Sequence, residues 1–294
     1  MKLSVLIVTY NSEYDIKPCL DTITAVKDEM EIIVIDNASQ DRTREILQTY
    51  PSIKTIFNRK NLGYARANNQ GVALSKGEYI LLLNPDTEVS PHSIFLLVEY
   101  LNQNPEVAAV APRLLNPDGS TQRSIRSFPT FLSVLGEITG FPQLFPNCHR
   151  LNRWRRRDFN YKKPNFVEQP MASCLLIRRA VFLELGGFDE NFPIYYNDVD
   201  LSYRMFQKGY KTYYLPSARV VHKIGGSTTP LKPKMIFENH RALFRFLKKH
   251  TPKTRFAFQA IILLPLLEIS ALLRVLYWHL THRPKPLSET SLNG

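Results

Sequence analysis

The chain has 294 residues, 44% of them hydrophobic, and is long enough to bury the core of one large catalytic domain. Its three cysteines are odd in number and lack metal-ligand spacing, and the first strand begins at once without a secretory signal, so we expect a reducing cytosol. The formal net charge is +12, but no recognition module or aromatic ladder accompanies the basic residues, which argues against a nucleic-acid-binding protein.

Strands and helices alternate along the first third of the chain. Strands are expected at residues 2–10, 31–35, 53–57 and 79–89, and helices after residue 13, over 42–50 and from residue 61. This alternation with short loops predicts βαβ units and an α/β fold, in which helices cover both faces of a mostly parallel sheet.

Polar clusters follow these strands, at residues 9–11, 36–41, 61–68 and 84–86. Ligands of open α/β sheets bind just beyond the carboxyl ends of the strands, so the four clusters should meet along one edge of the sheet. A nucleotide-binding site explains this arrangement most economically.

The last cluster follows an unbroken apolar run, YILLLNPDTEV, in which Asp86 lies at the strand tip. Mg²⁺ and Mn²⁺ prefer oxygen ligands and are commonly held by one or two carboxylates together with substrate phosphates. Asp86 is therefore a candidate ligand for a metal–diphosphate. Asn, Pro and Asp also favour turns, so a plain turn over 84–86 is an equal alternative.

Six motifs in a fixed order carry a family resemblance: VTYNS, VIDNASQDRT, NLGYARANNQG, LLLNPDTEV, IYYNDVDLSYR and VVHKIGGST. Together they resemble the inverting family 2 glycosyltransferases, and most closely the rhamnosyltransferase-like bacterial enzymes that build surface polysaccharides. Each motif alone is weak, whereas six at strand ends are specific, and the resemblance covers roughly residues 1–250. It implies a GT-A fold, a nucleoside-diphosphate sugar donor, a divalent metal (Mg²⁺ or Mn²⁺) and single displacement with inversion.

The resemblance assigns nucleotide-binding roles to the first two strand tips. Thr9, Tyr10 and Asn11 match the loop at the nucleotide base. Asp36 matches the carboxylate that reads the base or ribose, and a carboxylate can accept hydrogen bonds from an imide N–H or a hydroxyl.

The third cluster matches the segment beneath the ribose and diphosphate. Asn61, Gly63 and Asn68 are its matching residues. Arg66 would add a charge-assisted phosphate contact, although an exposed helical arginine is the more common situation.

The resemblance assigns the metal to Asp86 and His222. Asp86 matches the last carboxylate of the family's Asp-x-Asp signature, but its first acid is replaced by Asn84, which stays in the expected donor site. One carboxylate and phosphate oxygens must then hold the ion. His222 matches the histidine near the metal, and the glycine pair within 223–229 would let backbone N–H groups approach an anion.

Asp198 matches the family's catalytic base, which takes the proton of the attacking hydroxyl. The family usually has an acidic pair here, and Asn197 replaces its first member. Asp198 would equally serve as N-cap of a helix over 199–208, a position that lowers a carboxyl pKa. Asp200, in the first turn, is expected to serve the helix dipole or a buried hydrogen bond.

The basic residues concentrate at 150–163, with seven Lys and Arg against one acid, and at 232–255, with eight against one. The second group leads into 256–278, where 18 of 23 residues are apolar, although Pro265, Glu268 and Arg274 interrupt it. Basic residues beside an apolar helix predict attachment to an anionic membrane, with one helix or a kinked pair lying in the interface. An amphipathic helix packed on protein is the alternative.

The sequence therefore predicts a glycosyltransferase domain over 1–255, with a nucleotide-sugar half (1–115) and an acceptor half (116–255). An insertion over 128–165 belongs to the acceptor half, and its segment 151–157 is expected to touch lipid headgroups or an acceptor pyrophosphate. Residues 256–294 form a membrane-associating helix and tail.

The expected reaction moves rhamnose or another hexose from a dTDP- or UDP-sugar to a lipid-linked or growing glycan, at the cytoplasmic face of the membrane. The alternative is a non-catalytic, membrane-associated module that binds nucleotide sugars or glycans.

Overall fold

A computed structural model of the chain describes residues 2–24, 30–140, 148, 153–223 and 232–281. The chain forms two compact units, residues 1–230 and 231–294. The second unit therefore begins before residue 255, because the helix that precedes this residue packs with the C-terminal helix.

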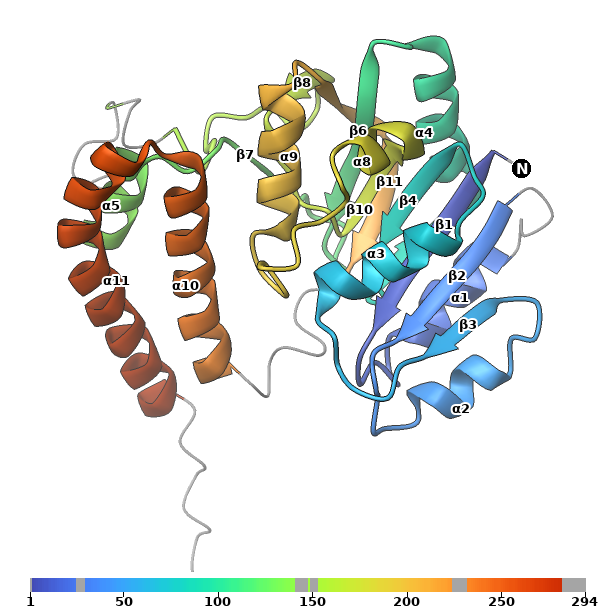
Figure 1. The fold of residues 1–294 in the computed structure, drawn as a ribbon. Coiled ribbons are helices and arrows are strands. Elements are labelled where there is room, and N and C mark those ends of the chain that lie inside the picture. Colours follow the sequence, from blue (N-terminus) through green and yellow to red (C-terminus); the bar gives the residue numbers. More distant parts are fainter. Residues whose placement is uncertain (1, 25–29, 141–147, 149–152, 224–231, 282–294) are drawn as a thin grey trace, which may run out of the picture. The chain divides into compact units, whose positions relative to one another are not determined.

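A nine-stranded mixed sheet organises the first unit, in the order β3-β2-β1-β4-β10-β6-β11-β5, with β8 paired to β11 (Figure 1). Its strands are β1 (Leu3–Thr9), β2 (Met30–Asp36), β3 (Lys54–Phe57), β4 (Tyr79–Leu83), β5 (Thr87–Val89), β6 (Val107–Leu115), β8 (Asn165–Val167), β10 (Cys174–Arg178) and β11 (Lys211–His222). The first four of these, β1 to β4, run parallel, and β10 pairs antiparallel to both β4 and β6. A separate ribbon joins β7 (Ile125–Arg126) to β9 (Gln169–Pro170).

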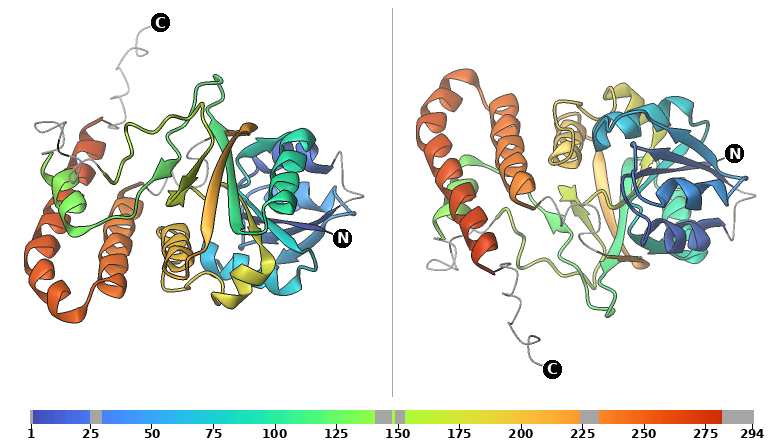
Figure 2. Two further views of the ribbon diagram at one scale, coloured as in Figure 1. Left: turned by 90° about the horizontal axis from the view of Figure 1, so that it is seen from above. Right: turned by 90° about the horizontal axis from the view of Figure 1, so that it is seen from below.

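Helices cover both faces of this sheet (Figure 2). The helices of the first unit are α1 (Ile16–Thr24), α2 (Thr43–Gln48), α3 (Tyr64–Leu74), α4 (Pro91–Gln103), α5 (Phe131–Thr139), α8 (Arg179–Glu184) and α9 (Asn197–Gln207), of which α5 does not cover the sheet. Successive side chains of a strand point to opposite faces, so β1 feeds two cores. Val5 and Ile7 pack on the side of α1 and α4, whereas Leu6 and Val8 pack on the side of α3, α8 and α9. This double burial explains the continuous apolar runs.

The predicted α/β architecture is confirmed, with shifts at several element ends. The run 79–89 forms two strands, because a turn at 84–86 redirects β5 to pair with β11. The turn is fixed by Thr87, whose hydroxyl donates to the Asn84 carbonyl at 2.6 Å. The expected turn over 84–86 is therefore observed, and it presents Asp86 at the strand tip.

The helix expected over 199–208 begins earlier, and its N-cap is Tyr196, with a left-handed φ of 67°. Asp198 consequently lies in the first turn and is not the N-cap, which corrects that alternative. The insertion over 128–165 contains α5 and ends at β8.

The second unit contains α10 (Lys232–His250) and α11 (Lys253–Thr281), which pack against each other. The ring of Phe244 lies 5.2 Å from that of Phe256, and His240 Nε2 lies 3.4 Å from the Ser270 hydroxyl. A single helix runs through Pro265, so the kinked pair is not observed. Of the helices that the structure describes, α11 is the one long and apolar enough to cross a membrane, with a mean hydropathy of 2.1 over its most apolar window.

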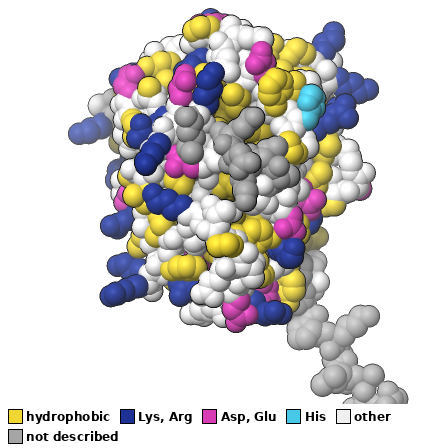
Figure 3. Space-filling view, turned by 90° about the vertical axis from the view of Figure 1, so that its right-hand side faces the viewer, with side chains coloured by type: hydrophobic (Ala, Val, Ile, Leu, Met, Phe, Trp, Pro, Cys, Tyr) yellow, Lys and Arg dark blue, Asp and Glu magenta, His cyan; other side chains and the backbone are white. Residues whose placement is uncertain are grey.

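The charges of the first unit are not segregated on the face shown in Figure 3. Lys and Arg side chains are interspersed there with acidic and apolar ones. This mixed surface lacks the single-sign appearance of a nucleic-acid-binding face.

Candidate active site

The parallel strands bring the predicted polar clusters to one edge of the sheet. Thr9 is in register with Asp36 across β1 and β2, and Ile7 is in register with Leu83 across β1 and β4. The strand ends that carry the nucleotide loop, the buried carboxylate and the turn at 84–86 are therefore neighbours.

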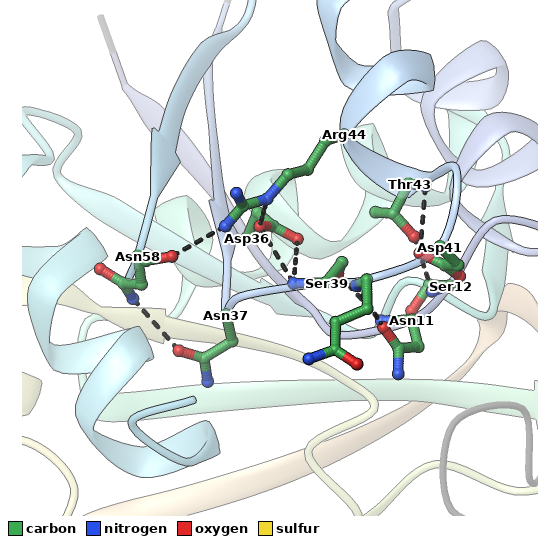
Figure 4. A network of polar contacts seen from close by, with 10 residues as sticks. Asn11, Ser12, Asp36, Asn37, Ser39, Asp41, Thr43, Arg44 and Asn58 are labelled. Carbon is green, nitrogen blue, oxygen red and sulfur yellow. Dashed lines mark hydrogen bonds and ion pairs between the residues drawn. The ribbon is translucent and has the colours of Figure 1, made fainter. Parts of the chain in front are cut away.

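A buried ion pair occupies the tip of β2 (Figure 4). The Asp36 carboxylate is inaccessible to solvent, accepts a 2.7 Å hydrogen bond from Arg44 Nε and receives the Ser39 N–H at 3.3 Å. Arg44 also donates to the Asn58 carbonyl at 2.8 Å. Asp36 thus shapes this loop through Arg44, a partner that the sequence reading missed although it directly follows the VIDNASQDRT motif.

Asn37 joins the second polar cluster to the third. Its amide oxygen accepts from the Leu62 N–H and from Asn58 Nδ2, both at 3.1 Å. Its amide nitrogen donates to Asn61 Oδ1 and to the Gly63 carbonyl, also at 3.1 Å. Asn61 is therefore held in place by its neighbour.

Gly63 is required by its conformation and its contacts. Its φ is +82°, and a Cβ there would lie 2.9 Å from the Pro193 carbonyl oxygen. That oxygen accepts the Tyr64 N–H at 2.6 Å. The third polar cluster is in this way tied directly to the segment that carries Asp198.

Two of the predicted donor-site residues present buried polar atoms without hydrogen-bond partners. Among the described residues, Thr9 Oγ1 and Asn68 Oδ1 have none. Asn11 has a left-handed φ of 50°, which lets its side chain accept the Gln40 N–H at 2.8 Å, while Tyr10 is half-buried. Buried polar groups are rarely left without a hydrogen bond, so Thr9 Oγ1 and Asn68 Oδ1 are candidates to bind a ligand.

Arg66 adopts the alternative expected of it. It is exposed on α3, and its Nε lies 3.6 Å from Glu190 Oε2. It is an exposed helical arginine with a weak surface partner.

Asp86 and His222 face each other where β4, β5 and β11 end. The Lys223 N–H donates to the Asp86 carbonyl at 2.8 Å, and Thr87 is in register with His222. The Asp86 side chain is 14% exposed, and its Oδ1 lies 3.3 Å from His222 Nε2 without a hydrogen bond of good geometry.

Gln122 fixes the tautomer of His222. Its amide nitrogen donates to the backbone carbonyls of His222, at 2.6 Å, and Leu115, at 3.3 Å, so its oxygen faces His222 Nδ1 at 3.0 Å. In neutral His222 the proton therefore sits on Nδ1, and the lone pair of Nε2 faces the Asp86 carboxylate. Two opposed electron pairs require a proton or a cation between them.

The side chains of this corner, Asp86 and His222, suit part of the coordination shell of a divalent cation. Carboxylate and imidazole are ligand types that Mn²⁺ accepts. Within the described residues no group of three His, Cys, Asp or Glu side chains could hold a metal ion alone, so substrate phosphates would have to complete the shell. The glycine run after Lys223 lies outside the described residues.

Asn84 braces the turn against β10. Its backbone N–H donates to the Ser173 carbonyl at 2.9 Å, and its side-chain amide donates to the Ser173 hydroxyl at 3.4 Å. It therefore orients the turn that presents Asp86.

Asp198 sits in the first turn of α9 with few close partners. Its Oδ1 accepts from the Val199 N–H at 2.8 Å, whereas Gln169 Nε2 and the Ala172 N–H lie 3.5 Å from Oδ2. Burial raises the pKa of Asp198 and outweighs the lowering by these hydrogen bonds and by Arg126. The pKa expected to fall at a helix N-terminus is therefore raised, the direction that favours a base.

Tyr64 responds to the charges of both carboxylates and was missed by the sequence reading. Burial raises its pKa first, and the negative charges of Asp198 and Asp86 raise it further. Its hydroxyl thus lies within electrostatic reach of both carboxylates. The motif NLGYARANNQG contained this residue, but no local pattern marked it.

Known proteins resemble this chain in sequence and in fold. Residues 4–186 match the profile of the family described as glycosyl transferase family 2. The N-acetylglucosaminyl-diphospho-decaprenol L-rhamnosyltransferase of Mycobacterium tuberculosis is 30% identical over 267 residues, which cover 83% of each chain. The rhamnosyltransferase WbbL of Escherichia coli is 23% identical over 255 residues, covering 83% of this chain and 92% of that protein.

Solved structures share the fold. The mannosyltransferase PcManGT from Pyrobaculum calidifontis, in complex with GDP-Man and Mn²⁺, superposes with a TM-score of 0.57 at 18% identity, covering 97% of this chain and 76% of that one. S. aureus TarS 1–349 in complex with UDP-GlcNAc gives a TM-score of 0.56 at 17% identity, covering 91% and 72%. Identities this low establish a common fold alone.

Proposed function

The chain belongs to glycosyl transferase family 2 and is a rhamnosyltransferase-like glycosyltransferase of GT-A fold, and we propose that it transfers rhamnose from its dTDP form to a sugar linked through diphosphate to a lipid. The acceptor follows the relative named for N-acetylglucosaminyl-diphospho-decaprenol. One observation carries the proposal: the Pro193 carbonyl, on the segment that carries Asp198, accepts the Tyr64 N–H at 2.6 Å, which ties the candidate base to the strand-tip clusters.

The donor is held at the strand tips of the first half. The unpartnered oxygens of Thr9 and Asn68 face ligand groups there, and the loop built by Asp36 and Asn37 shapes the base and ribose site. Asp86 and His222 would hold a divalent cation against the diphosphate. When bound, that cation neutralises charge on the diphosphate leaving group.

Asp198 is the general base of the reaction. The carboxylate takes the proton of the acceptor hydroxyl as the hydroxyl oxygen bonds to the anomeric carbon, and the bond from that carbon to the diphosphate oxygen breaks. The nucleoside diphosphate leaves with the bonding electrons, and attack from the opposite face inverts the configuration. Burial serves this step, because a base with a raised pKa binds the proton more strongly.

Membrane attachment through the second unit is part of the proposal. Ten apolar or aromatic residues of α11 are more than 45% exposed: Phe258, Ile261, Ile262, Leu264, Ile269, Leu272, Leu273, Leu276, Tyr277 and Leu280. Such a surface is unfavourable in water and suits an interface with lipid, and the basic residues of α10 suit an anionic one. We place the enzyme at the cytoplasmic face, where a lipid-linked acceptor would be presented.

The test is turnover with defined substrates. The full-length protein, Mn²⁺, dTDP-rhamnose and an N-acetylglucosaminyl diphospho-lipid should give a product heavier by one deoxyhexose. A thermal-shift series of dTDP-, UDP- and GDP-sugars, with and without Mn²⁺, should show metal-dependent stabilisation by the true donor. Stabilisation without product from any donor would favour the non-catalytic binding module, which the replacement of two family acids by Asn84 and Asn197 keeps under consideration.

A further inference from the structure

Two arginines, Arg126 and Arg155, lie near Asp198, and Arg126 belongs to the ribbon formed by β7 and β9. Arg126 on β7 is in register with Gln169 on β9, and Gln169 Nε2 lies 3.5 Å from Asp198 Oδ2. Arg126 is half-buried, yet its guanidinium has neither a hydrogen bond nor an ion pair with any of the described residues. A guanidinium carries five N–H donors, so its lack of partners within the fold is unusual.

Arg155 supplies a second guanidinium at the same place. The Ser127 N–H donates to the Trp154 carbonyl at 3.0 Å, which ties the chain beside Arg155 to the residue after Arg126. Arg155 forms an ion pair with Glu137 through one terminal nitrogen, while its buried Nε has no partner among the described residues.

These two arginines form a site with excess positive charge. Burial lowers the pKa of Arg126, and the charge of Arg155 lowers it further, while Tyr196, Asp198 and Glu137 act in the opposite direction. The positive charges of Arg126 and Arg155 thus lie close together, and Glu137 forms an ion pair with Arg155. The groups that act on Arg126 belong to the surroundings of the base, and none is at the corner of Asp86 and His222.

We propose that Arg126 and Arg155 bind the diphosphate of the acceptor while one hydroxyl of the attached sugar faces Asp198. This rests on the proposed function and specifies its acceptor. Arginine suits a diphosphate because its planar fork donates two parallel hydrogen bonds to phosphate oxygens. With the diphosphate on the arginines and the hydroxyl at Asp198, the enzyme would select a sugar attached directly to the diphosphate and glycosylate that first sugar.

A lipid headgroup would offer the same phosphate chemistry from another source. The position of Arg126 beside Gln169 and Asp198 favours the acceptor, since a headgroup there would occupy the place of the attacking sugar. Arg155 belongs to segment 151–157, for which the sequence predicted contact with one of these two phosphates. Residues 151 and 152 lie outside the described residues.

The test compares two acceptors with the same sugar and lipid. One is undecyl N-acetylglucosaminyl diphosphate, and the other is undecyl N-acetylglucosaminide, which lacks the diphosphate. The ratio of their kcat/KM values should be large in the wild type and should fall about 10- to 100-fold in Arg126→Gln, as expected when a hydrogen bond to a charged group is lost. Arg126→Lys, which keeps the charge but not the fork, should give an intermediate ratio. Arg123→Gln is the matched control, because Arg123 is exposed on the same segment, and should keep the wild-type ratio.

The outcomes separate this inference from the proposed function. Equal use of both acceptors by the wild type, or a ratio unchanged in Arg126→Gln, would overturn the diphosphate site while leaving the glycosyltransferase assignment standing. Failure of the wild type with every acceptor would instead count against the proposed function. Liposome binding distinguishes the headgroup, since loss of vesicle binding in Arg126→Gln with an unchanged acceptor ratio would assign the arginines to lipid.

Discussion

Asp198→Asn separates catalysis from folding at this site. The substitution keeps an oxygen that can accept from the Val199 N–H, now 2.8 Å from Asp198 Oδ1, and removes the proton acceptor. General bases contribute about 10² to 10⁴ to rate, so kcat should fall by at least roughly 10²-fold. Donor affinity should stay near normal, because Asp198 faces the acceptor.

The same substitution should not destabilise the protein. Burial raises the pKa of Asp198 above its ordinary value of 3.8, so the folded state binds the proton more tightly than the unfolded state. This difference destabilises the fold as pH rises from the unfolded pKa through the folded one. Asparagine carries no charge, and the free energy of unfolding at neutral pH should therefore be unchanged or higher.

Two measurements decide the outcome. Wild-type kcat/KM should fall as pH drops through a pKa above the usual aspartate range, and the residual activity of Asp198→Asn should lack that limb. Asp200→Asn is the contrasting control, because Asp200 is fully buried and paired with Arg204 at 2.7 Å, so this variant should lose about 3–5 kcal/mol of stability while its folded fraction keeps the acidic limb. An Asp198→Asn enzyme within tenfold of wild-type kcat, or one that retains the limb, would refute the assignment of the base.

Three further substitutions test the metal and the membrane. Asp86→Asn should abolish Mn²⁺-dependent donor binding. It should change the free energy of unfolding by less than about 0.5 kcal/mol, because Asp86 Oδ1 has no hydrogen bond to lose. Thermal shift measures both effects, and an unchanged dependence on Mn²⁺ would contradict the ligand role. Gln122→Met should weaken Mn²⁺ binding about 10- to 100-fold by freeing the tautomer of His222, and titration calorimetry in the presence of dTDP measures it; an unaltered Mn²⁺ affinity would argue against this positioning. Replacing Ile261, Leu272 and Leu276 by serine should convert salt-resistant binding to anionic liposomes into binding that washes off at high salt, because only the screened attraction of the basic residues remains. Flotation shows the difference, and full-length protein that never binds liposomes would assign α11 to a protein contact.

The fold was predictable because its signals are local. The strands β1 and β4 are buried on both faces, so the runs SVLIVT and YILLL predict strands from their own composition. The polar residues after these strands reach one edge as a consequence of parallel topology alone. Strand ends were less predictable, since the break after Leu83 depends on β5 finding β11, a pairing between segments far apart in sequence.

The residues that complete the site were hidden for the same reason. Gln122 orients His222 from 100 positions away, and Arg126 meets Gln169 only because two short segments pair as β7 and β9. The charges of two carboxylates that are far apart in sequence, Asp86 and Asp198, both raise the pKa of Tyr64. No spacing in the chain encodes these meetings, whereas Arg44, eight residues after its partner Asp36, could have been proposed as an ion pair.

The two amides that replace family acids have structural work that an acid could not perform. Asn197 Nδ2 donates to the Ile194 carbonyl at 2.7 Å and to the Phe192 carbonyl at 3.3 Å. A carboxylate at this buried position would oppose both carbonyl oxygens and would lie next to Asp198 in the sequence, so the two charges would repel. The amide therefore holds the loop and leaves one carboxylate to act as base.

Asn84 likewise has a structural role, next to the corner formed by Asp86 and His222. Its amide donates to the Ser173 hydroxyl, which braces the turn, and Asp86 remains the carboxylate that faces His222. A second carboxylate in place of Asn84 would strengthen attraction for a cation but would lose this donated bond. With one carboxylate and one imidazole, the corner would bind a cation weakly unless donor phosphates completed its coordination. Metal and donor should therefore bind cooperatively, which couples occupation of the metal site to the presence of a sugar to transfer.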